Sequence, residues 1–342
     1  MRLAVFAFGV VTALASGAPA FEVEDFRSYP ADGTATLRIL STADLDVFEP
    51  FILGFQAQEP EIAIEYTVAS SKEVFSAIRS EAAFDLVLSS AMDLQFQLAN
   101  DGYATTYTSE ATASLPAWAQ WRNMVFAFTA ESAVAVISEE HFADLTPPTT
   151  REGLIQMLRA APERFDGKVG TYDIRSSGLG YLFATQEARI SDTYWRLAEV
   201  MGQLDTDVFC CSGQMIDAVA AGELAIAYNV LGSYAAQRLQ EDDAAGLRII
   251  EFEDYSNVML RTALIPTTAQ NGDAAGRFLD RLLFEGLRDS GGAGTLPPLV
   301  NASVDGGSTF GPIRLGPALM VYLDPLNRAG FLESWENSVI NR

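Results

Sequence analysis

The sequence predicts an α/β protein with two doubly wound lobes, each built on a parallel sheet that is covered by helices on both faces. Strands alternate with helices in a first series that begins near residue 35, and they do so again in a second series near residue 134. A further strand and helix follow residue 258. A chain of 342 residues is also long enough for two domains.

In the first series, apolar and β-branched runs predict the strands, and apolar residues at helical spacing predict the helices between them. Ser41 and Thr42 follow the first strand directly, and Ser89 and Ser90 follow the third. The expected strands are 35–40, 62–68 and 84–88, and the expected helices are 47–55, a stretch around 74–78, and 94–100.

The second series has the same character, and Thr150 is a plausible N-cap for its first helix. Its expected strands are 133–137, 168–172, 207–209 and 224–230, and its expected helices are 152–159, 181–187 and 215–221.

The chain then returns to the first lobe through a strand at 258–266 and an amphipathic helix at 273–287. We therefore predict a first lobe formed by residues 21–133 and 251–342, and a second lobe formed by residues 134–250. Connecting segments near 130–134 and 250–258 are expected to act as the hinge.

The first 20 residues are interpreted as a secretory signal peptide. Arg2 precedes an apolar run, 3–15, which is too short to cross a bilayer because a spanning helix takes about 20 residues. Small residues at Ala18 and Ala20 predict cleavage after Ala20. Removing 20 of the 342 residues leaves a mature chain of 322 residues, which we expect in the periplasm.

Charge and composition argue against several classes of function. The formal net charge of −23 disfavours binding to phosphodiester backbones or to a bare anionic membrane. The only histidine, His141, excludes clustered His/Cys metal ligation. Cys210 and Cys211 are adjacent, so a strained disulfide between them, two free thiols and an intermolecular bond all remain open.

Three loops, at 41–44, 89–92 and 172–178, are candidates for a binding site, since the carboxyl ends of parallel strands meet at one crevice. They offer hydroxyls and backbone donors at helix starts, where the helix dipole favours anions. Arg175 suits a bidentate clamp on phosphate or carboxylate, and Asp44 and Asp173 suit solute hydroxyls. The candidate ligand-binding residues are Ser41, Thr42, Asp44, Ser89, Ser90, Tyr172, Asp173, Arg175, Ser176, Ser177, Tyr228 and Asn229.

Four segments together resemble the solute-binding proteins of ABC importers, of the type 2 periplasmic binding protein family that includes ferric-ion and phosphorylated-sugar receptors. They are LRILST at 37–42, FDLVLSS at 84–90, GELAIAYN at 222–229, and ALIP at 263–266 followed by AAGRFLD at 274–280. The resemblance implies two α/β lobes joined by a hinge, with the ligand in the cleft between them.

The resemblance and the loops predict a periplasmic receptor for a small polar, anionic solute such as an organophosphate, a sugar phosphate or a carboxylate. We expect a monomer that delivers this solute to an inner-membrane ABC permease and has no catalytic residues, metal or cofactor. Three alternatives remain: a sensory receptor for a membrane histidine kinase, a ferric-ion binding protein, and an extracytoplasmic hydrolase. The ferric reading is disfavoured because Tyr228 and Tyr234 are six residues apart. The hydrolase reading is disfavoured because the sequence contains no Gly-x-Ser-x-Gly motif.

Overall fold

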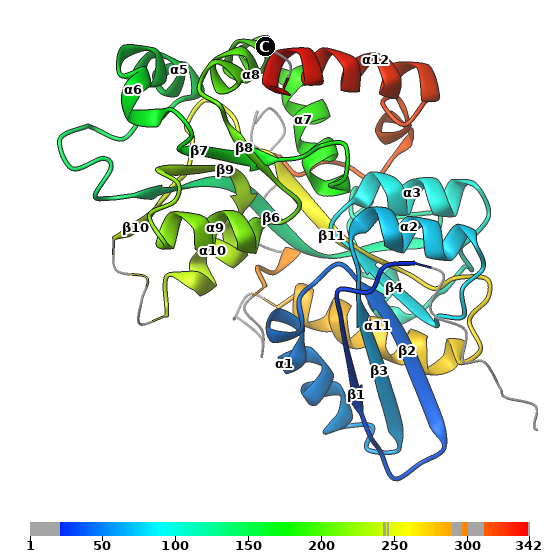
Figure 1. Cartoon of the computed structure of the whole chain (residues 1–342). Helices are drawn as coiled ribbons and strands as arrows, with labels where there is room; N and C mark the ends of the chain where they lie inside the picture. Colours follow the sequence, from blue (N-terminus) through cyan, green and yellow to red (C-terminus); the bar gives the residue numbers. More distant parts are fainter. Residues whose placement is uncertain (1–20, 242–243, 245, 289–295, 300–310, 341–342) are drawn as a thin grey trace, which may run out of the picture.

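The computed structural model describes residues 21–241, 244, 246–288, 296–299 and 311–340. Their strands follow the order β1-β3-β2-β4-β11-β6-β9-β7-β8, with helices on both faces (Figure 1). None of the helices within these residues is long and apolar enough to cross a membrane. The predicted signal peptide and its cleavage site lie outside the described residues.

The first half of the sheet has β2 at its centre, parallel to β3 on one side and to β4 on the other. The edge strand β1 pairs antiparallel with β3, and no strand was predicted before residue 35. Four of its five residues are exposed, so β1 lacks the apolar run that reveals the buried strands. The elements are β1 (Asp25–Tyr29), β2 (Ala35–Ser41), α1 (Leu45–Gln56), β3 (Ile62–Val68), α2 (Ser71–Arg79), β4 (Leu86–Ser89), α3 (Met92–Asn100), α4 (Glu110–Ala113) and β5 (Gln120–Trp121).

The second half has β7 parallel to both β8 and β9. Thr150 caps the first helix as predicted, because its hydroxyl accepts a hydrogen bond from the Gly153 N–H. The elements are α5 (Arg151–Ala160), α6 (Pro162–Phe165), β7 (Val169–Tyr172), α7 (Gly178–Ile190), α8 (Thr193–Gln203), β8 (Asp207–Phe209), α9 (Ser212–Ala220), β9 (Ile226–Leu231), α10 (Gly232–Arg238) and β10 (Leu247–Ile250).

Two connections cross between the halves. Strand β6 (Val125–Ser138) is far longer than predicted: it pairs with β11 (Val258–Leu264) as far as Ser132 and with β9 from Ala133 onward. Residues 251–257 form the return connection between β10 and β11. Both crossings coincide with the predicted hinge segments, and movement about them stays a prediction.

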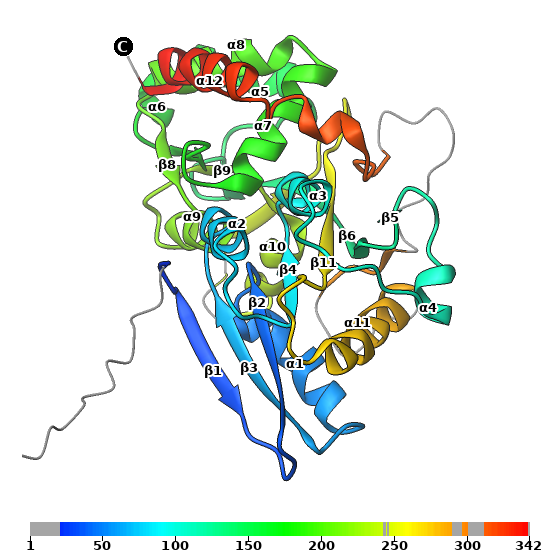
Figure 2. The same cartoon turned by 90° about the vertical axis from the view of Figure 1, so that its right-hand side faces the viewer.

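After β11, helix α11 (Gly272–Gly286) packs on the first half, as predicted. The end of the chain, in contrast, does not pack on the first half. Helix α12 (Pro325–Trp335) and the π-helical turn Glu336–Ile340 lie beside α7 and α8, far from β1 (Figure 1 and Figure 2). The Tyr181 hydroxyl donates to the Tyr322 carbonyl at 2.6 Å. We therefore propose that residues 325–340 belong with the second lobe rather than with the first.

Two buried arginines connect the lobes to the crossing segments. The Arg151 guanidinium, on α5, pairs with Glu187 at 2.9 Å and with Asp254 of the return connection at 2.8 Å. Arg261, on β11, pairs with Glu131 of β6 at 2.9 Å. A buried ion pair fixes the relative position of its two elements, because separating the partners leaves each charge buried without a counter-charge.

Asp93, on α3, gives a testable pH dependence. Its carboxyl is buried, its Oδ1 atom has no hydrogen-bond partner among the described residues, and burial raises the pKa of Asp93 to about 7. Because this value lies above the unfolded pKa of about 3.9, the folded protein loses stability as the pH rises from about 4 to about 7. Asp93→Asn should therefore raise the melting temperature by several degrees at pH 8 and leave it nearly unchanged at pH 4. A variant that melts lower at pH 8 would contradict this assignment.

Candidate ligand-binding cleft

A cleft of about 560 Å³, including its open mouth, lies between the two lobes. The first lobe contributes Glu24, Thr42, Asp44, Ser70, Ser71 and Ser90 to its walls. The second lobe contributes Tyr172, Ser176, Ser177, Ser212, Tyr234 and both cysteines.

Helix N-termini converge on this cleft. Its walls include the N-cap residues of five helices, namely Asp44 of α1, Ser70 of α2, Ser177 of α7, Cys211 of α9 and Leu231 of α10. The convergence follows from the topology, because helices that follow parallel strands start at the carboxyl edge of the sheet. Each start brings N–H groups without helical partners and a partial positive charge.

Six of the predicted residues line the cleft: Thr42, Asp44, Ser90, Tyr172, Ser176 and Ser177. The Thr42 hydroxyl accepts a hydrogen bond from the Ser90 N–H at 3.0 Å, which holds the loops after β2 and β4 together. The Ser177 hydroxyl caps α7 by accepting from the Gly180 N–H.

Ser41 and Ser89 do not line the cleft. Both are buried at strand ends, where their hydroxyls accept hydrogen bonds from the N–H groups of Ala43 and Ala91. Adjacent residues of a strand face opposite ways, so only one member of each polar pair faces the cleft.

Tyr228 and Asn229 also lie away from the cleft. The buried Tyr228 hydroxyl bonds to Glu187 at 3.0 Å and accepts a hydrogen bond from Arg151. Asn229 has a positive φ of 65° and lines a separate, smaller pocket. Tyr228 therefore serves the buried charge cluster of the second lobe.

Arg175 is not positioned as an anion clamp. Its guanidinium makes two hydrogen bonds of 2.8 Å to Asp173, and neither residue lines the cleft. Burial acts to raise the pKa of Asp173, but the bonds from Arg175 outweigh it and hold that pKa below its usual value. The sequence could not reveal that the two predicted ligand contacts satisfy each other.

The charged side chains of the cleft are acidic. Glu24 and Asp44 line it, and burial raises the pKa of both carboxyls. Among the described residues that form its walls there is no lysine, arginine or histidine. Backbone N–H groups at helix starts are therefore the donors that the cleft offers to an anion, and the two carboxylates suit donor groups such as solute hydroxyls.

The sequence reasoning missed Ser70, Ser71 and Glu24. A signal for the serines was present, because they follow the strand 62–68 after a single residue, Ala69. Glu24 carried no such signal, since it precedes an exposed edge strand. Tyr234, which the sequence brought up in connection with iron, lines the cleft as well.

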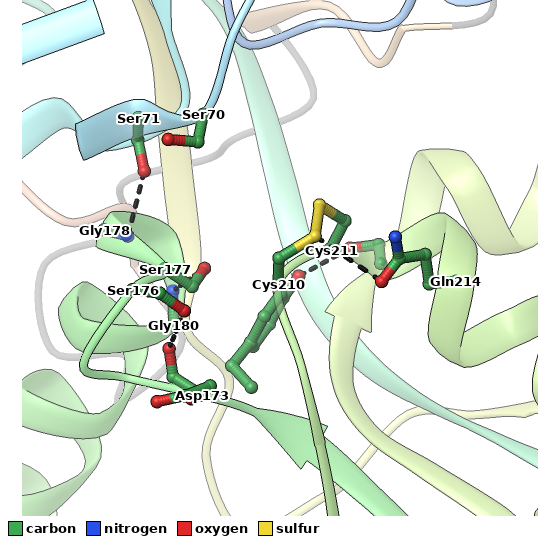
Figure 3. The surroundings of a disulfide bond; sticks show 12 residues. Ser70, Ser71, Asp173, Ser176, Ser177, Gly178, Gly180, Cys210, Cys211 and Gln214 are labelled. Carbon is green, nitrogen blue, oxygen red and sulfur yellow. Dashed lines mark hydrogen bonds between the residues drawn. A yellow bond between two sulfur atoms is a disulfide. The ribbon is translucent and has the colours of Figure 1, made fainter. Parts of the chain in front are cut away.

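Hydrogen bonds cross the cleft between the lobes. The Gly178 N–H of α7 donates to the Ser71 hydroxyl of α2 at 2.9 Å (Figure 3). The Asp44 N–H donates to the Tyr234 hydroxyl of α10 at 3.3 Å. The two lobes therefore touch at these two pairs, beside the residues that would meet a solute.

The cysteines form a disulfide with each other, which decides between the options that the sequence left open.

A ferric site receives no support from the donor set. The described residues hold no group of three or more His, Cys, Asp or Glu side chains that could bind a metal. Of the two tyrosines considered for iron, Tyr234 lines the cleft but Tyr228 does not.

Comparison with known proteins connects this architecture to a family. The family model for bacterial extracellular solute-binding proteins matches residues 37–285. The chain belongs to this family. The predicted resemblance, the two-lobed α/β fold and the assignment as a solute-binding protein of an ABC importer are thereby confirmed. A search of curated protein sequences found no match.

Solved structures agree with this assignment. The substrate binding protein of an ABC transporter from Agrobacterium tumefaciens is 30% identical, with a TM-score of 0.84 over 92% of this chain and 98% of that one. AfuA from Actinobacillus pleuropneumoniae, with fructose-6-phosphate bound, is 16% identical, with a TM-score of 0.70 over 90% of this chain and 99% of that one. The apo ferric ion-binding protein A of Pasteurella haemolytica is 16% identical, with a TM-score of 0.65 over the same shares. The last two share the fold alone.

Proposed function

We propose that this solute-binding protein captures a small polar solute with an anionic group, such as an organophosphate, a sugar phosphate or a carboxylate, in the interlobe cleft. The observation that carries the proposal is the convergence of five helix N-caps on a cleft whose described walls hold no cationic side chain. Backbone N–H groups at helix starts bind phosphate and carboxylate well.

The two carboxylates indicate which groups the rest of the solute carries. Glu24 and Asp44 accept hydrogen bonds, so they fit hydroxyl groups better than a second anion. A sugar or polyol that carries one phosphate offers an anion to the helix N-termini and hydroxyl groups to the two carboxylates. Fructose-6-phosphate, which is bound to AfuA, is a suitable first probe for this reason.

Capture requires contacts from both lobes. A solute that bonds to α1 and α2 of the first lobe and to α7 and α9 of the second favours the arrangement in which the lobes touch. We propose that the protein acts as a periplasmic monomer after cleavage behind Ala20, binds the solute without transforming it, and presents the closed form to an ABC permease in the inner membrane.

Ser90→Ala and Arg175→Ala test this site against the clamp expected from the sequence. A hydrogen bond to a charged group contributes about 1.5–3 kcal/mol, so Ser90→Ala should weaken fructose-6-phosphate binding roughly tenfold or more. Arg175→Ala should change the affinity less than about twofold, because its guanidinium stays on Asp173. Isothermal titration calorimetry gives both values, and melting curves confirm that both variants fold. The reverse pattern, with loss only in Arg175→Ala, would overturn the helix N-terminus model.

A further inference from the structure

The Cys210–Cys211 disulfide has no role in the function proposed so far. It lies between the end of β8 at Phe209 and the start of α9 at Ser212, and both cysteines are half-buried. Both also line the cleft. Figure 3 shows the two sulfur atoms on the side of the cleft across from Ser70 and Ser71 of the first lobe.

A contribution to stability does not explain this bond. Disulfides stabilise mainly by closing a loop in the unfolded chain, and a bond between neighbours closes no loop of intervening residues. The bond also leaves α9 without a side-chain cap, since Cys211 occupies the N-cap position and makes no capping hydrogen bond. A serine there would cap the helix better.

The chemistry of the bonded sulfurs differs from that of the other walls. A disulfide sulfur has no hydrogen to donate and is at most a weak acceptor, so it presents an apolar, polarisable surface. Leu179 and Leu231 line the cleft as well. The serine hydroxyls and the backbone N–H groups of the helix starts are thus the polar parts of the lining, and the sulfurs and the two leucines add apolar parts.

We propose that the Cys210–Cys211 disulfide is a specificity surface on which the carbon face of a sugar or polyol packs. This inference rests on the proposed function, because it assigns the part of the solute that the helix N-termini do not hold. Sugars have a C–H face that gains from contact with an apolar plate, while the hydroxyl edges reach Glu24 and Asp44. A small anion without a carbon face would not reach the sulfurs.

The test compares wild-type protein with the double variant Cys210→Ser/Cys211→Ser and with Cys210→Ala/Cys211→Ala. Calorimetry with three probes, fructose-6-phosphate, fructose and inorganic phosphate, separates the two walls. We expect the serine pair to lose tenfold or more in affinity for fructose-6-phosphate, and the alanine pair to lose less because it remains apolar. The affinity for inorganic phosphate should stay within twofold in both variants. Wild-type protein treated with a phosphine reductant should behave like the serine pair.

The outcomes separate this inference from the proposed function. If fructose binds in a disulfide-dependent way and phosphate does not bind, the anion proposal fails and the disulfide proposal stands. If both variants bind fructose-6-phosphate like the wild type, or lose all probes equally, the disulfide is not a specificity surface. If the wild type binds neither sugar, a sugar face on the disulfide is wrong. Melting curves and the mass of the alkylated, non-reduced protein confirm folding and the state of the bond.

Discussion

Replacing Gly178 with alanine is expected to weaken solute binding roughly fivefold or more while leaving the melting temperature of the solute-free protein unchanged. Gly178 is the first residue of α7, where it faces α2 and α3 of the other lobe. A Cβ atom there would lie 2.6 Å from the Ser71 Oγ and 3.0 Å from the Leu94 Cδ1. The first contact is shorter than real Cβ atoms show and the second is tighter than most, so Ser71 and Leu94 have to shift, or the lobes have to move apart, to admit the added methyl group.

The effect should fall on closure alone. Alanine is a good residue in a helix, and the clash disappears once the lobes separate. A strain of about 1–3 kcal/mol in the closed form therefore shifts the open–closed equilibrium and lowers the apparent affinity by roughly 5- to 150-fold. Titration with fructose-6-phosphate measures it.

Gly213→Ala is the matched control. Gly213 lies in the first turn of α9 in the same lobe, and a Cβ atom there would meet nothing within 4 Å. Its affinity should equal that of the wild type. Equal affinity in Gly178→Ala and Gly213→Ala would show that solute binding does not need the contact between α7 and α2.

Replacing Arg261 with methionine is expected to lower the free energy of unfolding by about 3–5 kcal/mol, because it leaves a buried carboxylate without its partner. Glu131 and Arg261 are both fully buried, and Thr129 and Ser233 donate further hydrogen bonds to Glu131. Glu131 lies where β6 leaves the first lobe, and Ser233 belongs to the second. The pair therefore supports one of the two crossings as well as the core.

Urea unfolding of Arg261→Met and of Arg27→Ala gives the comparison. Arg27 makes an exposed ion pair with Glu49, and because water and salt screen such a pair, its loss should change the stability little. Adding Glu131→Leu to Arg261→Met should recover part of the loss, because the stranded charge is then gone. A loss in Arg261→Met no larger than that in Arg27→Ala would contradict the structural role given to this pair.

The same pair predicts an acid sensitivity. Burial acts to raise the pKa of Glu131, but the charge and hydrogen bonds of Arg261 outweigh it and hold that pKa below its usual value. The stabilisation is therefore complete above the unfolded pKa of about 4.3 and is lost as the pH falls through the lower folded value. The difference in stability between wild type and the double variant should shrink at acidic pH.

The alternation of apolar strands and amphipathic helices was enough to predict the family and the order of the buried strands, but helices α4, α6, α8 and α10 and strand β10 were not predicted. Burial dictates those patterns, so each buried strand from β2 to β9 left a trace in the sequence. The exposed β1 left none, and the length of β6 was hidden because one continuous apolar strand serves two lobes. The position of α12 on the second lobe depends on contacts made late in the chain, which no local pattern encodes.

The candidate site was predictable in part. Polar residues after strands indicated the right edge of the sheet, and Thr42, Ser90 and Ser177 line the cleft. The orientation of each side chain was not predictable, since a shift of one residue along a strand sends Ser41 and Ser89 inward. Arg175 looked like an anion ligand because its charge was visible in the sequence, whereas its pairing with Asp173 was not.

The most direct test of the account is native mass spectrometry of the protein isolated from the periplasm without denaturation, followed by release and fragmentation of any bound solute. We predict one solute per chain, with a phosphate or carboxylate group on a hydroxylated carbon skeleton, and its loss in Gly178→Ala. A bound solute without an anionic group, or a ferric ion in its place, would contradict the proposal that helix N-termini hold an anion in this cleft.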